Sequence, residues 1–348
     1  MFKVEKRNGC SKTLNLKVRI SAVILALLTS ALFVLIMDKN PIDVYGSMIN
    51  GAFGTSYRIH ETFIKSIPLI ITSIGISIAF RMKFWNIGAE GQIMMGAFAA
   101  TFMALTFDNL PSYILLPLMF VSASIMGGLW GLIPGYFKAR FKTNETIFTL
   151  MMNYVAIKWI TYLQYGPWKD PKSLGFPKIR NFTENGVLPN FLGIHLGWVI
   201  ALLIVVFIHF YIKKTKSGFE INVVGESENT ARYAGMNVKA IIMRTIFLSG
   251  AICGIAGMIQ ASAVNKTLNV QLSGGVGYTA IITAWLSGLS APIIIVVSFL
   301  FAAMVQGGTF IQLVYQIPQS AAEILQGMIL FFVLGSEFFI RFKLVKVK

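Results

Sequence analysis

The sequence predicts an all-α, polytopic membrane protein with about ten membrane-spanning segments, some of them broken. Of its 348 residues, 55% are hydrophobic and only 13% are charged, and the mean hydropathy is +0.70. A typical soluble domain has roughly 25% charged residues. Apolar runs of about 20 residues recur along the chain, and each is long enough to cross a hydrocarbon layer roughly 30 Å thick. We therefore expect one membrane domain rather than a series of soluble domains.

Hydropathy windows of about 19 residues place the predicted spans along the whole chain. They lie near residues 18–37, 62–80, 86–106, 111–137, 146–163, 197–212, 240–261, 276–288, 291–313 and 321–340. The segment 276–288 is too short to cross alone as a straight helix. The first apolar stretch is too long for a signal peptide and is not followed by a small-residue cleavage site, so we expect it to remain as an uncleaved span.

The net charge of +16 fits a membrane topology and does not require a nucleic-acid partner. Lys and Arg lie in short clusters between the apolar runs, as the positive-inside rule predicts. Most of the 30 basic residues fall on one side when the N-terminus is placed inside, so both termini are expected in the cytosol, with tails at residues 1–17 and 341–348. Cys10 lies in a predicted tail and Cys253 in a predicted span, so neither a disulfide nor a metal site is indicated.

Two longer segments separate the spans. The predicted outer segment covers residues 165–196, and the predicted cytosolic segment covers 213–239. In the latter, Ser227 is a candidate N-cap, Glu228 an acidic first-turn residue and Gly235 a stop signal, which together predict a two-turn helix over 228–234. A helix of this length is marginal alone in water, so we expect it to dock against something.

No glycine in the chain is followed by lysine, so the phosphate-binding loop of ATPases is absent from this polypeptide. If ATP drives this protein, another chain binds it. His60, His195 and His209 lie far apart in the sequence, without carboxylates at metal-binding spacing. This pattern does not favour a hydrolase or a metal site.

Polar residues gather at the start of the predicted span 86–106. Asn86, Glu90 and Gln92 lie among glycines, where contact with lipid would be costly, so they are expected to face the bundle interior or a cavity. The alternative is that Glu90 is only a first-turn acid satisfied by Arg81 or Lys83. The residues themselves leave both interpretations open.

A second glycine-interrupted stretch, 273–288, contains Gly275 and Tyr278. Paired broken segments in two halves of a transporter indicate a site near the bilayer midplane, so we expect two structurally related halves. Asn153, deep in another span, fits either a helix contact or a pore-lining group. Glycines at intervals of about four predict close helix packing; they are Gly127, Gly131, Gly135, Gly250, Gly254 and Gly257.

Three motifs resemble one family. Residues 84–92 look like the "F-N-I-G-x-E-G-Q" element of permeases in the nucleoside and simple-sugar branch of bacterial ABC importers, and residues 144–154 resemble that branch's "N-E-V-I-x-T-L-M-L-N-Y" span. Residues 225–236 are similar to its cytosolic "G-x-N-x-x-A-A-x-x-A-G-I" loop. The resemblance runs from about Thr62 to the C-terminus. This chain departs from the pattern in the loop, at Asn222, Ser227 and Thr230.

The resemblance implies an ABC permease domain over residues 18–340, with 213–239 as its coupling loop. It implies uptake of nucleosides by alternating access, with a simple-sugar permease as the alternative. A secondary transporter driven by ions would need intramembrane acids, and the sequence offers few beyond Glu90.

The same resemblance implies partners and site residues. The chain would bind no cofactor, because ATP and Mg belong to a separate ATP-binding subunit, and it would also meet a second, homologous permease, an extracellular or periplasmic substrate-binding protein and membrane lipid. Together with the glycine-interrupted stretch 273–288, the resemblance gives the predicted substrate-path residues Asn86, Glu90, Gln92, Asn153, Gly275 and Tyr278. The implied ATPase-coupling residues are Gly225, Glu228, Asn229, Arg232 and Gly235.

Overall fold

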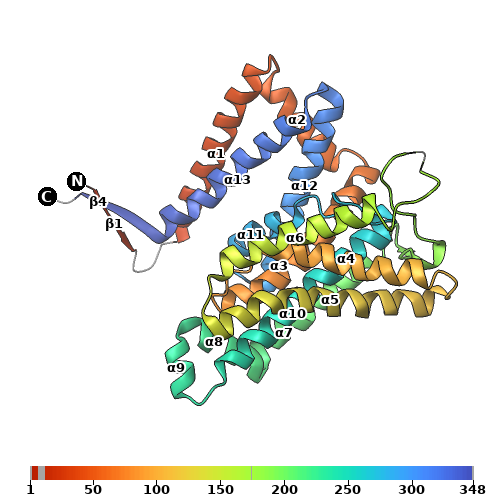
Figure 1. Cartoon of the computed structure of the whole chain (residues 1–348). Helices are drawn as coiled ribbons and strands as arrows, with labels where there is room; N and C mark the ends of the chain where they lie inside the picture. Colours follow the sequence, from red (N-terminus) through yellow and green to blue (C-terminus); the bar gives the residue numbers. More distant parts are fainter. Residues whose placement is uncertain (1, 7–11, 174, 347–348) are drawn as a thin grey trace. The chain divides into compact units, whose positions relative to one another are not determined.

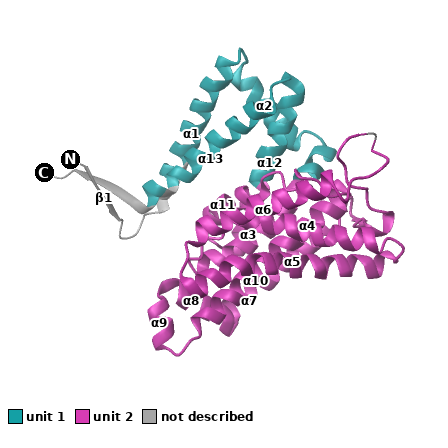
Figure 2. Cartoon of the chain, in the orientation of Figure 1, with its two compact units in different colours: residues 1–62, 300–348 teal, residues 63–299 magenta. Residues whose placement is uncertain are grey.

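The computed structural model describes residues 2–6, 12–173 and 175–346, and it is mainly α-helical (Figure 1). Cys10 lies outside the described residues. The chain forms two compact units, residues 1–62 with 300–348 (unit 1) and residues 63–299 (unit 2), which are coloured separately in Figure 2.

Unit 1 is built from the two ends of the chain. Its α1 packs along α13, and the first strand, β1, pairs with the last strand, β4, so the chain ends lie together (Figure 1). A bend of 111° separates α1 from α2, a helix that the hydropathy windows did not predict. The elements are β1 (Phe2–Lys6), α1 (Lys12–Ile36), α2 (Pro41–Phe53), the start of α3 (Ser56–Arg81), the end of α12 (Ala291–Tyr315), α13 (Gln319–Arg341) and β4 (Phe342–Lys346).

Local sequence explains where α2 begins. The side chain of Asn40 accepts a hydrogen bond from the backbone N–H of Ile42 at 3.0 Å, and Pro41 occupies the first helical position, where its missing N–H costs nothing. The small core of unit 1 then forms between Val34 of α1, Val44 of α2, and Ile311 and Leu325 from the C-terminal helices. The predicted tails therefore contain structure in their described parts: the paired strands, and α1, which starts at Lys12.

Unit 2 is a helical bundle that contains every candidate site residue. A loop with the short strands β2 (Asn190–Phe191) and β3 (Ile194–His195) joins α6 to α7. The helices are the rest of α3, α4 (Ala89–Thr106), α5 (Ser112–Phe141), α6 (Glu145–Tyr165), a 3₁₀ turn (Glu184–Gly186), α7 (Gly197–Lys214), α8 (Lys216–Glu226), α9 (Glu228–Tyr233), α10 (Val238–Ile259) with a π turn (Gln260–Asn265), α11 (Val276–Leu286) and the start of α12.

The centre of unit 2 is the contact among α4, α5 and α10, where glycines let the backbones meet. A Cβ added to Gly254 of α10 would lie 2.3 Å from the carbonyl oxygen of Ala123 in α5, and one added to Gly257 would lie 2.0 Å from the carbonyl oxygen of Ile93 in α4. Neither position can hold a side chain unless the helices separate. Gly127 and Gly250 approach each other in the same way. The close packing predicted from glycine spacing is confirmed.

The number of spans predicted from the sequence is not confirmed. A helix lies at each predicted position, but within the described residues six helices are long and apolar enough to cross a membrane, or up to seven if the bent pair α1–α2 counts as one span. These are α3, α5, α7, α10 with its π turn, α12 and α13. Polar side chains within α4 and α6 and the shortness of α11 keep these three outside that group. The expectation of two related halves is likewise not confirmed.

Candidate functional site

The start of α4 is organised by two buried amides. The side-chain N–H₂ of Asn86 donates to Oε1 of Gln92 at 3.1 Å and to the hydroxyl of Ser249 on α10 at 3.2 Å. Its Oδ1 accepts from the N–H of Gly88 at 3.1 Å and from Nε2 of Gln92 at 3.3 Å. Both side chains are almost fully buried. They face the protein interior, as the sequence predicted, and they satisfy each other there.

Glu90 is the anchor between α4 and the segment that leads into α11. Its carboxylate is buried and accepts three hydrogen bonds, from the hydroxyl of Ser273 at 2.5 Å and from the N–H groups of Gly275 at 3.1 Å and Gly277 at 2.8 Å. The charge therefore lies at the N-terminal end of a helix, where backbone N–H groups favour an anion. Gly277 is required by this contact, because an added Cβ would lie 2.4 Å from the backbone N of Glu90.

The alternative partners of Glu90 are engaged elsewhere. The guanidinium of Arg81 donates to the carbonyl of Leu289 at 2.6 Å, and the ammonium of Lys83 lies 3.4 Å from the carbonyl of Glu226. The interpretation of Glu90 as a first-turn acid satisfied by either residue is wrong. The physical reason is that the broken segment before α11 supplies donors inside the bundle, closer to the carboxylate than either basic side chain.

Asn153 joins α6 to both segments. Its Oδ1 accepts from the N–H of Gly91 at 2.8 Å, and its N–H₂ donates to the carbonyl of Ile87 at 2.9 Å and to the hydroxyl of Tyr278 at 3.3 Å. Of the two roles that the sequence left open, the structure shows the helix contact. Tyr278, 37% exposed, is the most accessible member of this group.

All six sequence-predicted path residues thus lie in one polar network, five through their side chains and Gly275 through its backbone N–H. We call it the polar network; it comprises Asn86, Glu90, Gln92, Asn153, Ser249, Ser273, Gly275, Gly277 and Tyr278. Ser249 was missed by the sequence reasoning, because a single serine in an apolar span carries no signal. Ser273 and Gly277 belong to the glycine-interrupted stretch, but nothing in the sequence paired them with Glu90.

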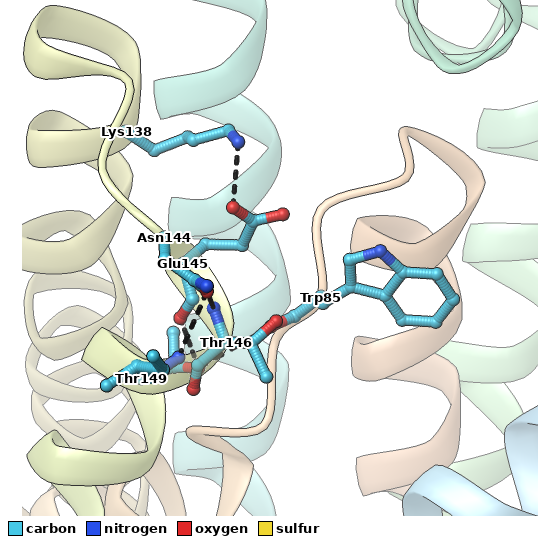
Figure 3. Close-up of polar contacts among 7 residues, drawn as sticks. Trp85, Lys138, Asn144, Glu145, Thr146 and Thr149 are labelled. Atoms are coloured by element: carbon cyan, nitrogen blue, oxygen red, sulfur yellow. Dashed lines mark hydrogen bonds and ion pairs between the residues drawn. The ribbon is translucent and has the colours of Figure 1, made fainter.

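A second set of polar contacts fixes the start of α6 (Figure 3). Asn144 caps the helix by accepting from the N–H groups of Thr146 at 3.0 Å and Ile147 at 3.3 Å. Glu145 forms an ion pair with Lys138 of α5 at 2.7 Å. The hydroxyl of Thr149 accepts from the N–H of Ile87 at 3.2 Å, which ties α6 to the loop before α4.

The predicted two-turn helix is present as α9, Glu228–Tyr233. The hydroxyl of Ser227 accepts from the N–H of Thr230 at 3.2 Å, and Glu228 pairs with Arg232 at 3.5 Å on the exposed surface. Gly235 follows with φ of +75°, a conformation that favours glycine. Asn229 is exposed beside them, and only Ala231 of this helix is buried.

Gly225 differs from the other residues assigned to coupling. It is buried at the end of α8, and a Cβ placed there would lie 1.9 Å from the carbonyl oxygen of Arg81. The glycine therefore lets α8 pack on the end of α3, which positions the chain that leads into α9.

Comparison with known proteins places this geometry in context. Residues 58–334 match the family model described as "Branched-chain amino acid transport system / permease component". The guanosine ABC transporter permease protein NupP of Bacillus subtilis is 34% identical, over 96% of this chain and 97% of its own length. The glucose ABC transporter permease protein TsgB13 of Haloferax volcanii is 29% identical, over 92% and 87%. The nucleoside ABC transporter permease protein NupB of Lactococcus lactis is 27% identical, over 97% and 95%.

Proposed function

The chain belongs to the branched-chain amino acid transport system permease family, and from this premise we propose that it is the subunit of an ATP-driven importer that translocates nucleosides. The observation that carries the proposal is the 34% identity, over 96% of the chain, to a permease named for guanosine. A second relative is named for nucleosides. The relative named for glucose supports a simple-sugar permease as the second candidate.

The polar network supplies groups that suit a neutral, hydroxyl-rich substrate. The amides of Asn86, Gln92 and Asn153 each present donors and an acceptor, and the hydroxyl of Tyr278 presents both. In this conformation Asn86 and Gln92 bind each other, Asn153 binds the backbone at the start of α4, and Glu90 binds the segment before α11. We assign this arrangement to a closed state of the path. Alternating access would then require the α11 segment to move away from Glu90 and Asn153, so that substrate hydroxyls replace the internal partners.

Energy would come from a partner. The chain has no phosphate-binding loop, and α9 is an exposed two-turn helix whose burial rests on a single alanine. A helix this short gains order by docking, and we assign it to a groove of an ATP-binding subunit, which would hold ATP and Mg. Among the described buried residues the only acids are Glu90 and Glu145, and Glu145 is paired with Lys138, so no acidic relay supports an ion-driven mechanism.

The remaining partners follow from the same assignment. They are a second, homologous permease and a substrate-binding protein on the outer side of the cytoplasmic membrane. The pairing of β1 with β4 supports placing both chain ends on one side of the membrane. The clustering of basic residues near the termini and after α7 supports assigning that side to the cytosol.

Uptake measurements in a strain that lacks this gene test the proposal. Radiolabelled guanosine, adenosine and uridine should enter more slowly than in the parent strain, and uptake should return when the intact gene is restored. Glucose and ribose uptake should not change. Loss of sugar uptake with normal nucleoside uptake would favour the second candidate, and no change in any of the five would contradict both.

A further inference from the structure

A basic cavity of about 580 Å³ lies between the end of α5, helix α9 and the start of α10. It is separate from the polar network and shares no residue with it. Five of its lining side chains are cationic, and only one, Glu228, is anionic. The cations are Lys138, Arg140 and Lys142 from the last turn and the end of α5, Arg232 from α9 and Lys239 from α10.

The charges in this cavity do not balance. Lys138 is neutralised by Glu145 at 2.7 Å, and Arg232 is paired with Glu228 at 3.5 Å. The side chains of Arg140, Lys142 and Lys239 have no hydrogen bond or ion pair to any described residue. Three uncompensated positive charges therefore face one cavity, and like charges this close favour the binding of an anion.

The cavity is placed at the level of lipid headgroups. Helix α5 has 30 residues and extends about 45 Å, which exceeds a hydrocarbon thickness of about 30 Å. Unpaired cations are costly in hydrocarbon, so the last turn of α5, which carries Arg140, must project beyond it. The first turn of α10, with Lys239, lies across the same cavity.

Exposed aromatic rings lie on the same turns of α5. Phe141 is 61% exposed, and its ring lies 5.7 Å from that of Phe137, which in turn stacks on Phe148 of α6 at 5.0 Å. Tyr136 extends this cluster. Aromatic side chains concentrate at the membrane interface, where one part of the ring meets acyl chains and another meets the polar region. The cationic cavity thus adjoins an apolar surface, the combination that an amphipathic anion needs.

We propose that this cavity binds the phosphate-bearing headgroup of an anionic phospholipid, with the acyl chains against Phe137 and Phe141. The inference rests on the proposed function only in taking α5 and α10 as membrane spans. The phosphate oxygens accept hydrogen bonds from Arg140, Lys142 and Lys239, which supply the donors that no protein group uses. Glu228 and Arg232 of α9 line the same cavity. A bound lipid would therefore contact the cavity-facing side of α9 and stabilise the helix that we assign to ATPase docking.

The test measures lipid binding directly and needs neither substrate nor ATPase. The full chain, purified in detergent, is titrated with dioleoyl phosphatidylglycerol and separately with dioleoyl phosphatidylcholine, and bound lipid is counted by native mass spectrometry. We expect phosphatidylglycerol to bind at least about tenfold more tightly, since each basic residue near a membrane surface favours anionic lipid and three of them line this cavity unpaired. The triple variant Arg140→Gln, Lys142→Gln, Lys239→Gln should lose this preference.

The matched control is Lys213→Gln with Lys214→Gln, which removes two cations at the end of α7 that do not line the cavity. It should keep the preference, and thermal unfolding of each variant in the same detergent verifies that it is folded. If the triple variant does not fold, Arg140→Gln and Lys239→Gln alone should each weaken phosphatidylglycerol binding.

Three results would overturn the proposal. The triple variant or both single variants could retain the full preference for phosphatidylglycerol. That result would show that Arg140, Lys142 and Lys239 do not bind the headgroup. Free glycerol 1-phosphate could displace phosphatidylglycerol at equal concentration, which would make this a site for a soluble phosphate. The wild-type chain could fail to distinguish the two lipids, which would show that the cavity does not select an anionic headgroup.

Discussion

At the scale of single residues, the contacts of Glu90 predict a specific cost for its neutral replacement. Its carboxylate accepts from Ser273, Gly275 and Gly277 inside the bundle. Glu90→Gln keeps one acceptor oxygen but turns an N–H₂ group toward a buried donor. Hydrogen bonds to charged groups contribute about 1.5–3 kcal/mol, so we expect a loss of roughly 2 kcal/mol in stability and a clear loss of nucleoside uptake.

Thermal unfolding in detergent and uptake in cells measure the two effects. Glu61→Gln is the matched control, because this half-buried carboxyl of α3 has no bonded partner among the described residues. Stability and uptake equal to wild type in Glu90→Gln would show that the three hydrogen bonds are incidental to both folding and transport.

His195, in the loop between α6 and α7, predicts a pH dependence. Burial lowers the pKa of its imidazole to about 4, and neither ring nitrogen has a hydrogen-bond partner in the described part of the chain. The unfolded chain, with a histidine pKa of about 6.5, binds the proton first, so folding stability is fully present above pH 6.5 and falls as the pH drops toward 4. The loss reaches at most about 3 kcal/mol, since one pKa unit corresponds to about 1.4 kcal/mol.

Unfolding temperatures measured between pH 7 and pH 4.5 check this slope. The variant His195→Leu removes the titrating group without breaking a hydrogen bond, so its unfolding temperature should fall less over this range than that of the wild type. Parallel curves for His195→Leu and the wild type would mean that folding does not lower the pKa of this ring.

The buried polar residues at the start of α4 could be predicted from the sequence, but their partners could not. Asn86, Glu90 and Gln92 could be placed in the interior because polar groups are costly against lipid. Their partners could not, because Ser273 lies 183 positions from Glu90 and Ser249 lies 163 positions from Asn86. A single sequence gives no signal that pairs residues at such separations. The packing of the broken segment against α4 brings Ser273 to Glu90, and the packing of α10 brings Ser249 to Asn86.

At the scale of elements, α9 predicts the behaviour of the coupling segment. Gly235 ends the helix with φ of +75°, so Gly235→Val should cost about 1–2 kcal/mol locally. Arg232→Glu places two acids four residues apart and reverses the charge on the exposed face. Both variants should insert normally and lose transport through weaker or uncoupled ATPase binding.

Pull-down of the ATPase subunit and substrate-stimulated ATP hydrolysis in proteoliposomes measure this coupling. Gly235→Asn is the matched control for the backbone, because asparagine tolerates the left-handed conformation, and Lys213→Glu is the control for charge reversal. Intact binding with wild-type stimulation in both test variants would reduce α9 to a connector.

Helix-capping and stop residues made the ends of some helices predictable from the sequence. Ser227 and Gly235 fixed both ends of α9, and Asn144 fixed the start of α6. The same kind of signal, Asn40 followed by Pro41, begins α2, but the hydropathy windows did not detect α2, because they search for long apolar runs. Glycine spacing in α5 and α10 predicted close helix packing, but it predicted neither that these two helices would meet each other nor that Gly96 of α4 would also meet Gly254.

At the scale of the whole molecule, the division into two units was not predictable from hydropathy. Apolar windows locate segments but do not say which of them pack together, and unit 1 forms from the first and last parts of the chain. The predicted number of about ten spans is not confirmed, and the reason is related. A segment such as α4 can pack mostly inside the protein, where the polar groups of Glu90 and Gln92 are satisfied, so it need not be as apolar as a lipid-facing span.

The last prediction concerns topology, which follows from the single crossing of α7. Phe176, 77% exposed in the loop before α7, and Tyr233, 92% exposed on α9 after it, should lie on opposite sides of the membrane. Because Lys213, Lys214 and Lys216 follow α7, the positive-inside rule predicts that the α9 side faces the cytosol. In a background carrying Cys10→Ser and Cys253→Ala, a membrane-impermeant maleimide should label Phe176→Cys in right-side-out vesicles and Tyr233→Cys in inside-out vesicles.

The parent without cysteine should not be labelled in either preparation, since both natural thiols are removed. Labelling of both positions from one side would mean that α7 does not cross, and labelling in the reverse order would place α9 outside, where no cytosolic ATPase could reach it.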